Sequence, residues 1–209
     1  MKINNVTIST SNSKLGGFIP CINLPPVITC NPLAPCTRGG CYACTGNFSY
    51  ANVKTSLKNN LNEFIKNPQN YFDTIINYLN NSLVIYKYFR WHSSGDIVNA
   101  EYFNGVIEVA KKCKNTTFLI FTKKFKIIND YLNAGGKIPK NLKVIFSAWD
   151  TSFKVVNPFS LPVSYVKFKD NNKYKYITPN DASGYPCKGK CENCLYCFKN
   201  NKNVVFNQH

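Results

Sequence analysis

Four cysteines near the C-terminus have a spacing that suits a metal centre. They are Cys187, Cys191, Cys194 and Cys197, in a C-x3-C-x2-C-x2-C run that follows Pro186. Bacterial ferredoxins ligate iron-sulfur clusters with the intervals C-x2-C-x2-C-x3-C-P, which are the same intervals in the opposite order. A structural zinc site usually has two separate C-x2-C pairs, whereas these pairs share Cys194. This four-cysteine run therefore favours an iron-sulfur cluster, 4Fe-4S in particular, with zinc as the alternative.

A second set of cysteines lies in the N-terminal quarter of the chain. Cys30, Cys36, Cys41 and Cys44 are separated by five, four and two residues, with prolines and glycines between them. Proline and glycine bend the backbone, so these distant sulfurs could converge on one site. Ten cysteines in a chain without an export signal indicate metal ligands rather than disulfides, because reducing compartments keep thiols free. We expect all four to be metal ligands.

The composition predicts one folded unit. The chain has 209 residues, of which 44% are hydrophobic and 14% aromatic, enough for the packed core of a single domain over residues 1–209. No apolar run approaches the roughly 20 residues that span a bilayer, so we expect no membrane partner and a cytoplasmic location. Cys21 and Cys113 stand apart from the other cysteines and are expected to be buried thiols.

The formal net charge of +16 predicts attraction to a polyanion such as nucleic acid. Lysines spread over a solvated surface are the alternative reading. Arg90, Lys123 and Lys124 are the candidates for nucleic-acid or anion contact, although Arg90 could also form a buried ion pair. Trp91 and Trp149 could stack on a base or pack in the core.

Hydrophobic periodicity predicts alternating strands and helices. The expected helices cover residues 51–66, 68–79, 98–112 and 124–132, and the expected strands cover residues 86–92, 117–122, 141–147, 163–168 and 204–206. A further short strand is expected at Phe18–Ile19. Strands that alternate with helices imply a parallel sheet. The predicted fold is α/β, either a partial parallel (β/α) barrel or an open parallel sheet.

Polar side chains follow the expected strands where each strand ends. His92 and Asp96 follow the strand at 86–92, and they could form a general acid/base pair; alternatively, Asp96 could cap the next helix. In parallel α/β folds, ligands bind outside the carboxyl ends of the strands. We expect the cysteine-rich segments 30–44 and 187–197 to cap this edge of the sheet.

The chain resembles, over nearly its whole length, a phage and prophage family catalogued as gene product eighty-eight. Besides the four-cysteine run, the resemblance is carried by Asn12–Gly16, Ile22–Pro25, Thr29–Cys30, Ala34–Cys36, Cys41–Ala43, Phe89–Asp96, Phe121–Lys124, Asn141–Leu142, Phe146–Ser147 and Asn157–Pro158. Cys44 departs from the family's pattern, which leaves seven matching cysteines. The resemblance implies a phage-encoded protein in the host cytoplasm, and it implies no particular activity.

A looser resemblance is to radical S-adenosylmethionine enzymes. Those enzymes place three cysteines after an early strand and a Gly-Gly-Glu-like tip after the next strand. Here Cys30, Cys36 and Cys41 precede a strand that is followed by Ser94-Gly95-Asp96. The family's C-x3-C-x2-C spacing is absent at this place and occurs within the four-cysteine run. The resemblance implies S-adenosylmethionine as a cofactor, held by Ser94, Gly95 and Asp96.

Three classes of function remain open at this point. The first is an iron-sulfur enzyme that acts on nucleic acid or on a phosphorylated substrate, with a radical S-adenosylmethionine enzyme as a variant of it. The second is a nucleic-acid-binding module whose fold is held together by structural zinc and which catalyses no reaction. The third is a redox sensor that uses its clusters to change partner binding. Metal and sulfide content distinguishes the iron-sulfur readings from the zinc reading.

Overall fold

The computed structural model describes residues 1–10 and 12–208, and within them the strands form one open sheet of nine. In spatial order the strands are β1 (Lys2–Ile3), β2 (Val6–Ser9), β3 (Cys21–Ile22), β4 (Tyr88–Trp91), β5 (Thr117–Thr122), β6 (Leu142–Ser147), β7 (Val163–Lys167), β9 (Val204–Asn207) and β8 (Tyr185–Pro186). The pairs β1–β2 and β2–β3 are antiparallel, and every pair from β3 to β8 is parallel. The predicted α/β class with an open parallel sheet is confirmed.

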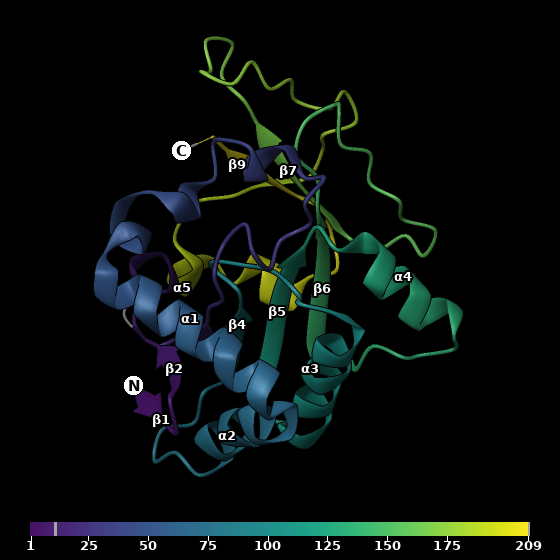
Figure 1. Cartoon of the computed structure of the whole chain (residues 1–209). Helices are drawn as coiled ribbons and strands as arrows, with labels where there is room; N and C mark the ends of the chain where they lie inside the picture. Colours follow the sequence, from purple (N-terminus) through teal and green to yellow (C-terminus); the bar gives the residue numbers. More distant parts are fainter. Residues whose placement is uncertain (11, 209) are drawn as a thin grey trace.

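Four helices cover one face of this sheet. They are α1 (Ala51–Lys66), α2 (Pro68–Asn80), α3 (Ala100–Lys112) and α4 (Phe125–Asn133), and Figure 1 shows the first three in front of the strands. Phe72 and Phe103 from these helices join Phe89, Trp91 and Phe118 from β4 and β5 in the main core. The helices predicted from periodicity differ from these only at their ends.

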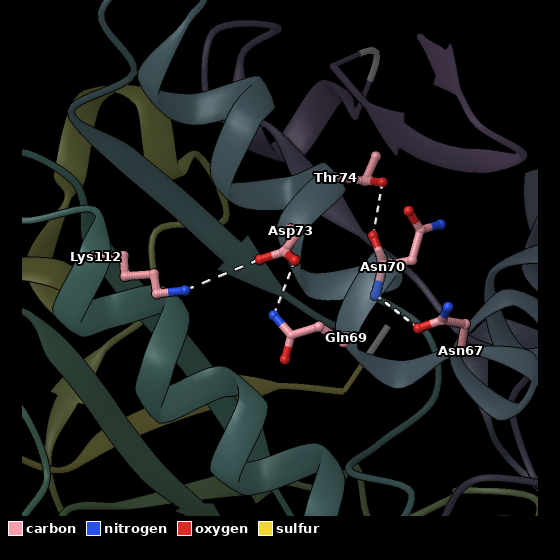
Figure 2. Close-up of polar contacts among 6 residues, drawn as sticks. All are labelled: Asn67, Gln69, Asn70, Asp73, Thr74 and Lys112. Carbon is pink, nitrogen blue, oxygen red and sulfur yellow. Dashed lines mark hydrogen bonds and ion pairs between the residues drawn. The ribbon is translucent and has the colours of Figure 1, made fainter.

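The junction between α1 and α2 is fixed by a helix cap. Asn67 Oδ1 accepts a hydrogen bond of 2.9 Å from the N–H of Asn70, and Pro68 occupies the first position of α2 (Figure 2). Further along α2, Asp73 lies 3.9 Å from Lys112 of α3. Because this ion pair is exposed, it contributes little to stability. The cap ends α1 and starts α2, so both helices pack on the same face.

The opposite face of the sheet carries a second, smaller core. Leu119 of β5 and Ile145 of β6 pack there with Leu15, Ile19 and Phe198. This face is covered by the C-terminal segment that contains α5 (Cys191–Cys194) and α6 (Tyr196–Lys199), drawn in yellow in Figure 1. Strands β5 and β6 are therefore buried on both faces, which explains the nearly continuous apolar run at residues 117–122.

Two N-terminal features differ from the expectations. The sequence pattern did not predict the hairpin of β1 and β2, whose two-residue turn, Asn4-Asn5, has φ angles of 47° and 64°. Positive φ at both positions defines a type I′ turn, which asparagine tolerates. The strand expected at Phe18–Ile19 is wrong: Phe18 is half exposed, and pairing starts at Cys21. The cause is the left-handed backbone at Gly16 and Gly17, which makes the chain turn there.

Candidate ligand cavity and cysteine sites

A cavity of about 460 Å³ lies where the parallel strands end. The tips of five strands contribute to its wall: His92 after β4, Lys123 after β5, Trp149 after β6, Phe168 after β7, and Phe206 within β9. This volume is within the usual range for small-molecule sites, and the carboxyl edge of a parallel sheet is where such folds bind ligands. The prediction of a polar site at this edge agrees with the position of the cavity.

Three of the four N-terminal cysteines face this cavity. Cys30, Cys36 and Cys41 line it, whereas the Cys44 side chain is exposed and lies outside the wall. Burial, together with the negative charge of the nearby Asp96 carboxyl, raises the pKa of Cys30 to about 12. Burial also raises the pKa of Cys36, with Lys123 acting in the opposite direction. The three thiols thus share one wall, and Cys44 lies outside that wall but close enough to Cys41 that the two side chains interact.

Short hydrogen bonds tie this cysteine segment to the tip of β4. Asn23 Oδ1 accepts from the N–H groups of Ser93 (2.7 Å) and Ser94 (3.1 Å), and Ser94 Oγ donates to the carbonyl of Leu24. Gly95 has a φ of 80°, and a Cβ there would lie 2.7 Å from the same carbonyl. Only glycine allows the two loops to approach this closely. The loops before Cys30 and after β4 are therefore held as one unit.

The loop at residues 169–182 holds the cysteine segment from its other side. The Tyr176 hydroxyl lies 3.0 Å from the carbonyl of Pro35 and 2.9 Å from that of Gly39 and donates to them. The Tyr174 ring packs against Gly39 and Gly40, where a Cβ would overlap it. Sequence reasoning did not find these two tyrosines, because nothing local to residues 169–182 indicates a contact with residues 35–40.

The four-cysteine run lines a second, smaller pocket. All four of its cysteines are half-buried, and the N–H of Gly189 donates to Cys187 Sγ at 3.4 Å. Leu195, with a φ of 51°, separates α5 from α6 and reverses the chain between Cys194 and Cys197. Burial raises the pKa of Cys197 to about 12, and the positive charge of Arg90 opposes this.

The position of this pocket refines the expectation that both cysteine segments cap the carboxyl edge. The N-terminal segment does so. The four-cysteine run instead packs against the face of the sheet that the long helices do not cover. Phe198 anchors it, with its ring centroid 5.1 Å from that of Tyr88. Arg90, Lys14 and Phe121 line both the cavity and the smaller pocket. The two cysteine sites are therefore neighbours that share part of one wall.

His92 and Asp96 are both buried at the tip of β4, and each has its own partners. His92 Nε2 lies 2.9 Å from the Tyr102 hydroxyl. Asp96 Oδ1 accepts from the N–H of Ile97 at 2.7 Å, and Oδ2 accepts from the N–H of Lys123 at 2.8 Å. Burial raises the pKa of Asp96, and these hydrogen bonds, together with one from Thr122, oppose it. Their role as an acid/base pair stays a prediction.

The alternative reading of Asp96 as a helix cap is wrong. Helix α3 begins at Ala100, and its cap is Asn99, whose Oδ1 accepts from the N–H of Tyr102 at 2.8 Å. Asp96 lies too early in the chain to reach the first turn, and its oxygens bond the Ile97 and Lys123 N–H groups instead. Its structural role is to join the tips of β4 and β5.

The basic and aromatic candidates divide between cavity and core. Arg90 and Lys123 line the cavity, and the Lys123 Nζ donates to Ser147 Oγ at 2.9 Å. Lys124 lies outside the wall, at the residue that precedes α4. Trp91 is fully buried in the main core, and Trp149 lines the cavity. Core packing therefore holds for Trp91, and stacking of Trp149 on a base stays a prediction.

His92 is expected to make the protein less stable as the pH falls. Burial and the charge of Arg90 lower its pKa to about 3, while an unfolded chain has the usual value near 6.5. Below pH 6.5 the unfolded state therefore binds more protons than the folded state, and stability decreases toward pH 3. The free energy of unfolding should drop by about 2 kcal/mol from this residue between pH 7 and pH 5. Urea unfolding at each pH measures this change.

His92→Asn is the control for this effect, because asparagine accepts the φ of 54° at this position and does not titrate. Other titrating groups act on both proteins alike, so the difference between wild type and variant isolates the histidine. An equal loss of stability in both proteins between pH 7 and pH 5 would contradict the prediction.

Within the described residues, no three or more His, Cys, Asp or Glu side chains are grouped so that they could hold a metal ion. The same part of the chain contains no helix that is both long enough and apolar enough to cross a membrane.

The fold and the site define an α/β protein whose open, mostly parallel sheet carries a cysteine-lined cavity at its carboxyl edge. The family model described as Gene product 88 matches residues 2–200. The chain therefore belongs to this phage protein family, which confirms the first resemblance. No curated protein and no solved structure matches the chain. The resemblance to radical S-adenosylmethionine enzymes stays a prediction.

Proposed function

We propose that this protein is an iron-sulfur enzyme with two cluster sites. Cys30, Cys36 and Cys41 would hold one cluster at the wall of the cavity, and the four-cysteine run would hold a second, complete one. The observation that carries the proposal is that three thiols share a cavity wall with the polar tips of five parallel strands. A cluster with three cysteine ligands leaves one iron free to bind a molecule in the cavity.

The chemistry of the donor set fits iron-sulfur clusters. The seven ligands are all thiols, which are the soft ligands that such clusters take. The cysteines of a cluster bind different iron atoms, so their sulfurs lie farther apart than the roughly 4 Å between the ligands of one tetrahedral zinc ion. The N–H of Gly189 on Cys187 Sγ and the cations Arg90 and Lys14 beside Cys191 would stabilise the negative charge of a cluster.

The surrounding residues would prepare the cavity for chemistry. When bound, the open cluster would supply electrons or a coordination position for a ligand. Asp96 and Asn23 hold the strand tips in place, and Tyr176 holds the loop at residues 169–182 against the cysteine segment. His92 stays neutral at physiological pH, so its free Nδ1 could accept or donate one hydrogen bond to a bound molecule, according to its tautomer.

Radical S-adenosylmethionine chemistry is a second candidate, and the order of the elements favours it. The three cysteines follow β3, the first parallel strand, and Ser94-Gly95-Asp96 follows β4, its parallel neighbour. Both groups line the same cavity. In this reading the cofactor would lie between the cysteine wall and the β4 tip, and Ser94, Gly95 and Asp96 would position it.

Anaerobic purification of the full chain, followed by iron, sulfide and zinc analysis, tests the proposal. We expect iron and sulfide in equal amounts and an absorbance band near about 400 nm from thiolate-ligated iron. A changed electron paramagnetic resonance spectrum after adding S-adenosylmethionine to the reduced sample would support the second candidate. A colourless protein with stoichiometric zinc would contradict the proposal and favour the zinc-stapled nucleic-acid-binding module.

A further inference from the structure

We infer that the cavity binds a nucleotide, with the base against its aromatic side chains and the phosphate on its cations. The inference rests on the proposed function for the reacting centre, and it names the class of substrate. Its support comes from the part of the cavity wall that contains no cysteines, although two of its cations, Arg90 and Lys14, also line the pocket of the four-cysteine run.

Every cation that lines the cavity lies over an aromatic ring of the same wall. The distances from cation to ring centroid are 5.0 Å for Lys14 over Phe206, 4.6 Å for Arg90 over Phe121, and 5.1 Å for Lys123 over Trp149. Such pairs hold the charged groups at fixed positions beside flat apolar surfaces. The wall thus alternates between sites for an anion and sites for a planar ring.

These cations lack acidic partners. Within residues 1–10 and 12–208, no carboxylate forms an ion pair with Lys14, Arg90 or Lys123. Asp96 is the one acidic residue among the described residues of the wall, and both of its oxygens already accept backbone N–H groups. The cavity therefore has an excess of positive charge, and an anionic ligand would balance it.

Three buried polar atoms of the wall also lack partners among the described residues. They are Arg90 Nε, His92 Nδ1 and Trp149 Nε1, and His92 is only 3% exposed. Leaving a buried polar group without a hydrogen bond is unfavourable, so such groups are usually satisfied by a ligand or by water. The planar guanidinium of Arg90 matches the geometry of a phosphate, to which it can donate two hydrogen bonds.

The aromatic side of the cavity suits a base. Trp149 packs edge-on against Phe168, at 5.4 Å between ring centroids, and against Tyr176, at 5.6 Å. Tyr174 stacks on Tyr176 at 5.5 Å. Stacking of a base on such a ring is favourable for all of the bases, because each has a flat aromatic face. An apolar ligand would leave the cations unpaired, and a phosphate without a ring would leave this surface unused.

The nucleotide could be free or could be one residue of a nucleic-acid strand, and both sources present the same base and phosphate. The net charge of +16 would attract a strand to the surface around the cavity. An experiment therefore needs one arm with nucleoside monophosphates and one with a short single-stranded oligonucleotide.

Equilibrium binding to the anaerobically purified full chain tests the inference, with iron measured on each sample. The probes are the four nucleoside 5′-monophosphates, the matching nucleosides, inorganic phosphate, and a single-stranded octanucleotide. We expect the monophosphates to bind at least about 10-fold tighter than the nucleosides or phosphate alone, because each charged hydrogen bond contributes about 1.5–3 kcal/mol. Tighter binding of the octanucleotide would identify a strand as the source, and equal or weaker binding would identify the free nucleotide.

Arg90→Met is expected to weaken monophosphate binding at least about 10-fold and to leave nucleoside binding nearly unchanged. Arg38→Met is the matched control, because Arg38 is the other arginine of the chain and is exposed outside the cavity. Lys14→Met gives a second test of the phosphate position if the Arg90 variant fails to fold.

Equal affinity for nucleosides and monophosphates, or equal effects of the Arg90 and Arg38 variants, would overturn the inference. A protein that contains iron and sulfide but binds no nucleotide would overturn this inference and leave the proposed iron-sulfur function standing. Nucleotide binding by a protein that contains no iron would support the inference and overturn the proposed iron-sulfur function.

Discussion

Replacing Cys36 by alanine is expected to remove about four of about eight iron atoms per chain, because two 4Fe-4S clusters carry four irons each. Cys36 is the most buried of the three thiols on the cavity wall, and the variant would leave a cluster there with two cysteines. Cys191→Ala should remove the other four irons and leave the cavity site loaded. Iron and sulfide per chain, with the absorbance near about 400 nm, measure both losses.

Cys44→Ala is the control for this division of the iron atoms between two sites. Its side chain is exposed and lies outside the cavity wall, so its loss should leave the iron content unchanged. A Cys44 variant that loses as much iron as the Cys36 variant would show that the open site has four cysteines. Loss of all iron from either single variant would contradict the assignment of two separate sites.

The central part of the fold was predictable from the sequence, because local patterns and topology agree there. Residues 118–121 are apolar on both faces and residues 144–146 are apolar and buried, and each strand is followed by polar groups at its tip. Such runs identify buried parallel strands without any knowledge of their neighbours. Short strands give weaker patterns: β3 and β8 have two residues each, and only pairing with a neighbour defines them.

The candidate site was predictable where it follows strand ends and not where distant segments complete it. His92, Asp96 and Lys123 were found because each follows an apolar strand. Lys14 and Phe206 were missed, because they reach the cavity from opposite ends of the chain. Strand β9 lies between β7 and β8 in the sheet, an order that the local sequence does not reveal. The Asn4-Asn5 hairpin was also missed, because its strands are only two and four residues long and its turn lacks the glycine of the usual hairpin signal.

The alternation of side chains along β4 explains why Arg90 and Trp91 have different environments. Successive residues of a strand point to opposite faces, so Phe89 and Trp91 enter the helix-covered core. Tyr88 and Arg90 point to the other face, where the four-cysteine run packs. The sequence predicts this alternation but not which face carries the cysteines. That choice depends on how the C-terminal segment folds back across the sheet.

Phe198→Ala is expected to lower the free energy of unfolding by about 3–5 kcal/mol, the usual cost of removing a buried phenylalanine ring. Phe198 is 2% exposed, contacts Tyr88, and packs with Leu119 and Ile145 beneath the four-cysteine run. Without this anchor the run would lose its place against the sheet, so its irons should be lost while the cavity site stays loaded. Urea unfolding and iron analysis measure the two effects.

Phe198→Leu is the matched control, because leucine fills most of the same space and should cost less than about 1.5 kcal/mol. If the run is held to the sheet by Phe198, the leucine variant keeps its iron and the alanine variant loses it. The alanine variant could instead lose iron from the cavity site, or could lose less than about 1 kcal/mol of stability, well below the range for such a ring. Loss of iron from the cavity site would contradict the separation of the two sites, and the small loss of stability would mean that the bound cluster, rather than apolar packing, positions the C-terminal segment.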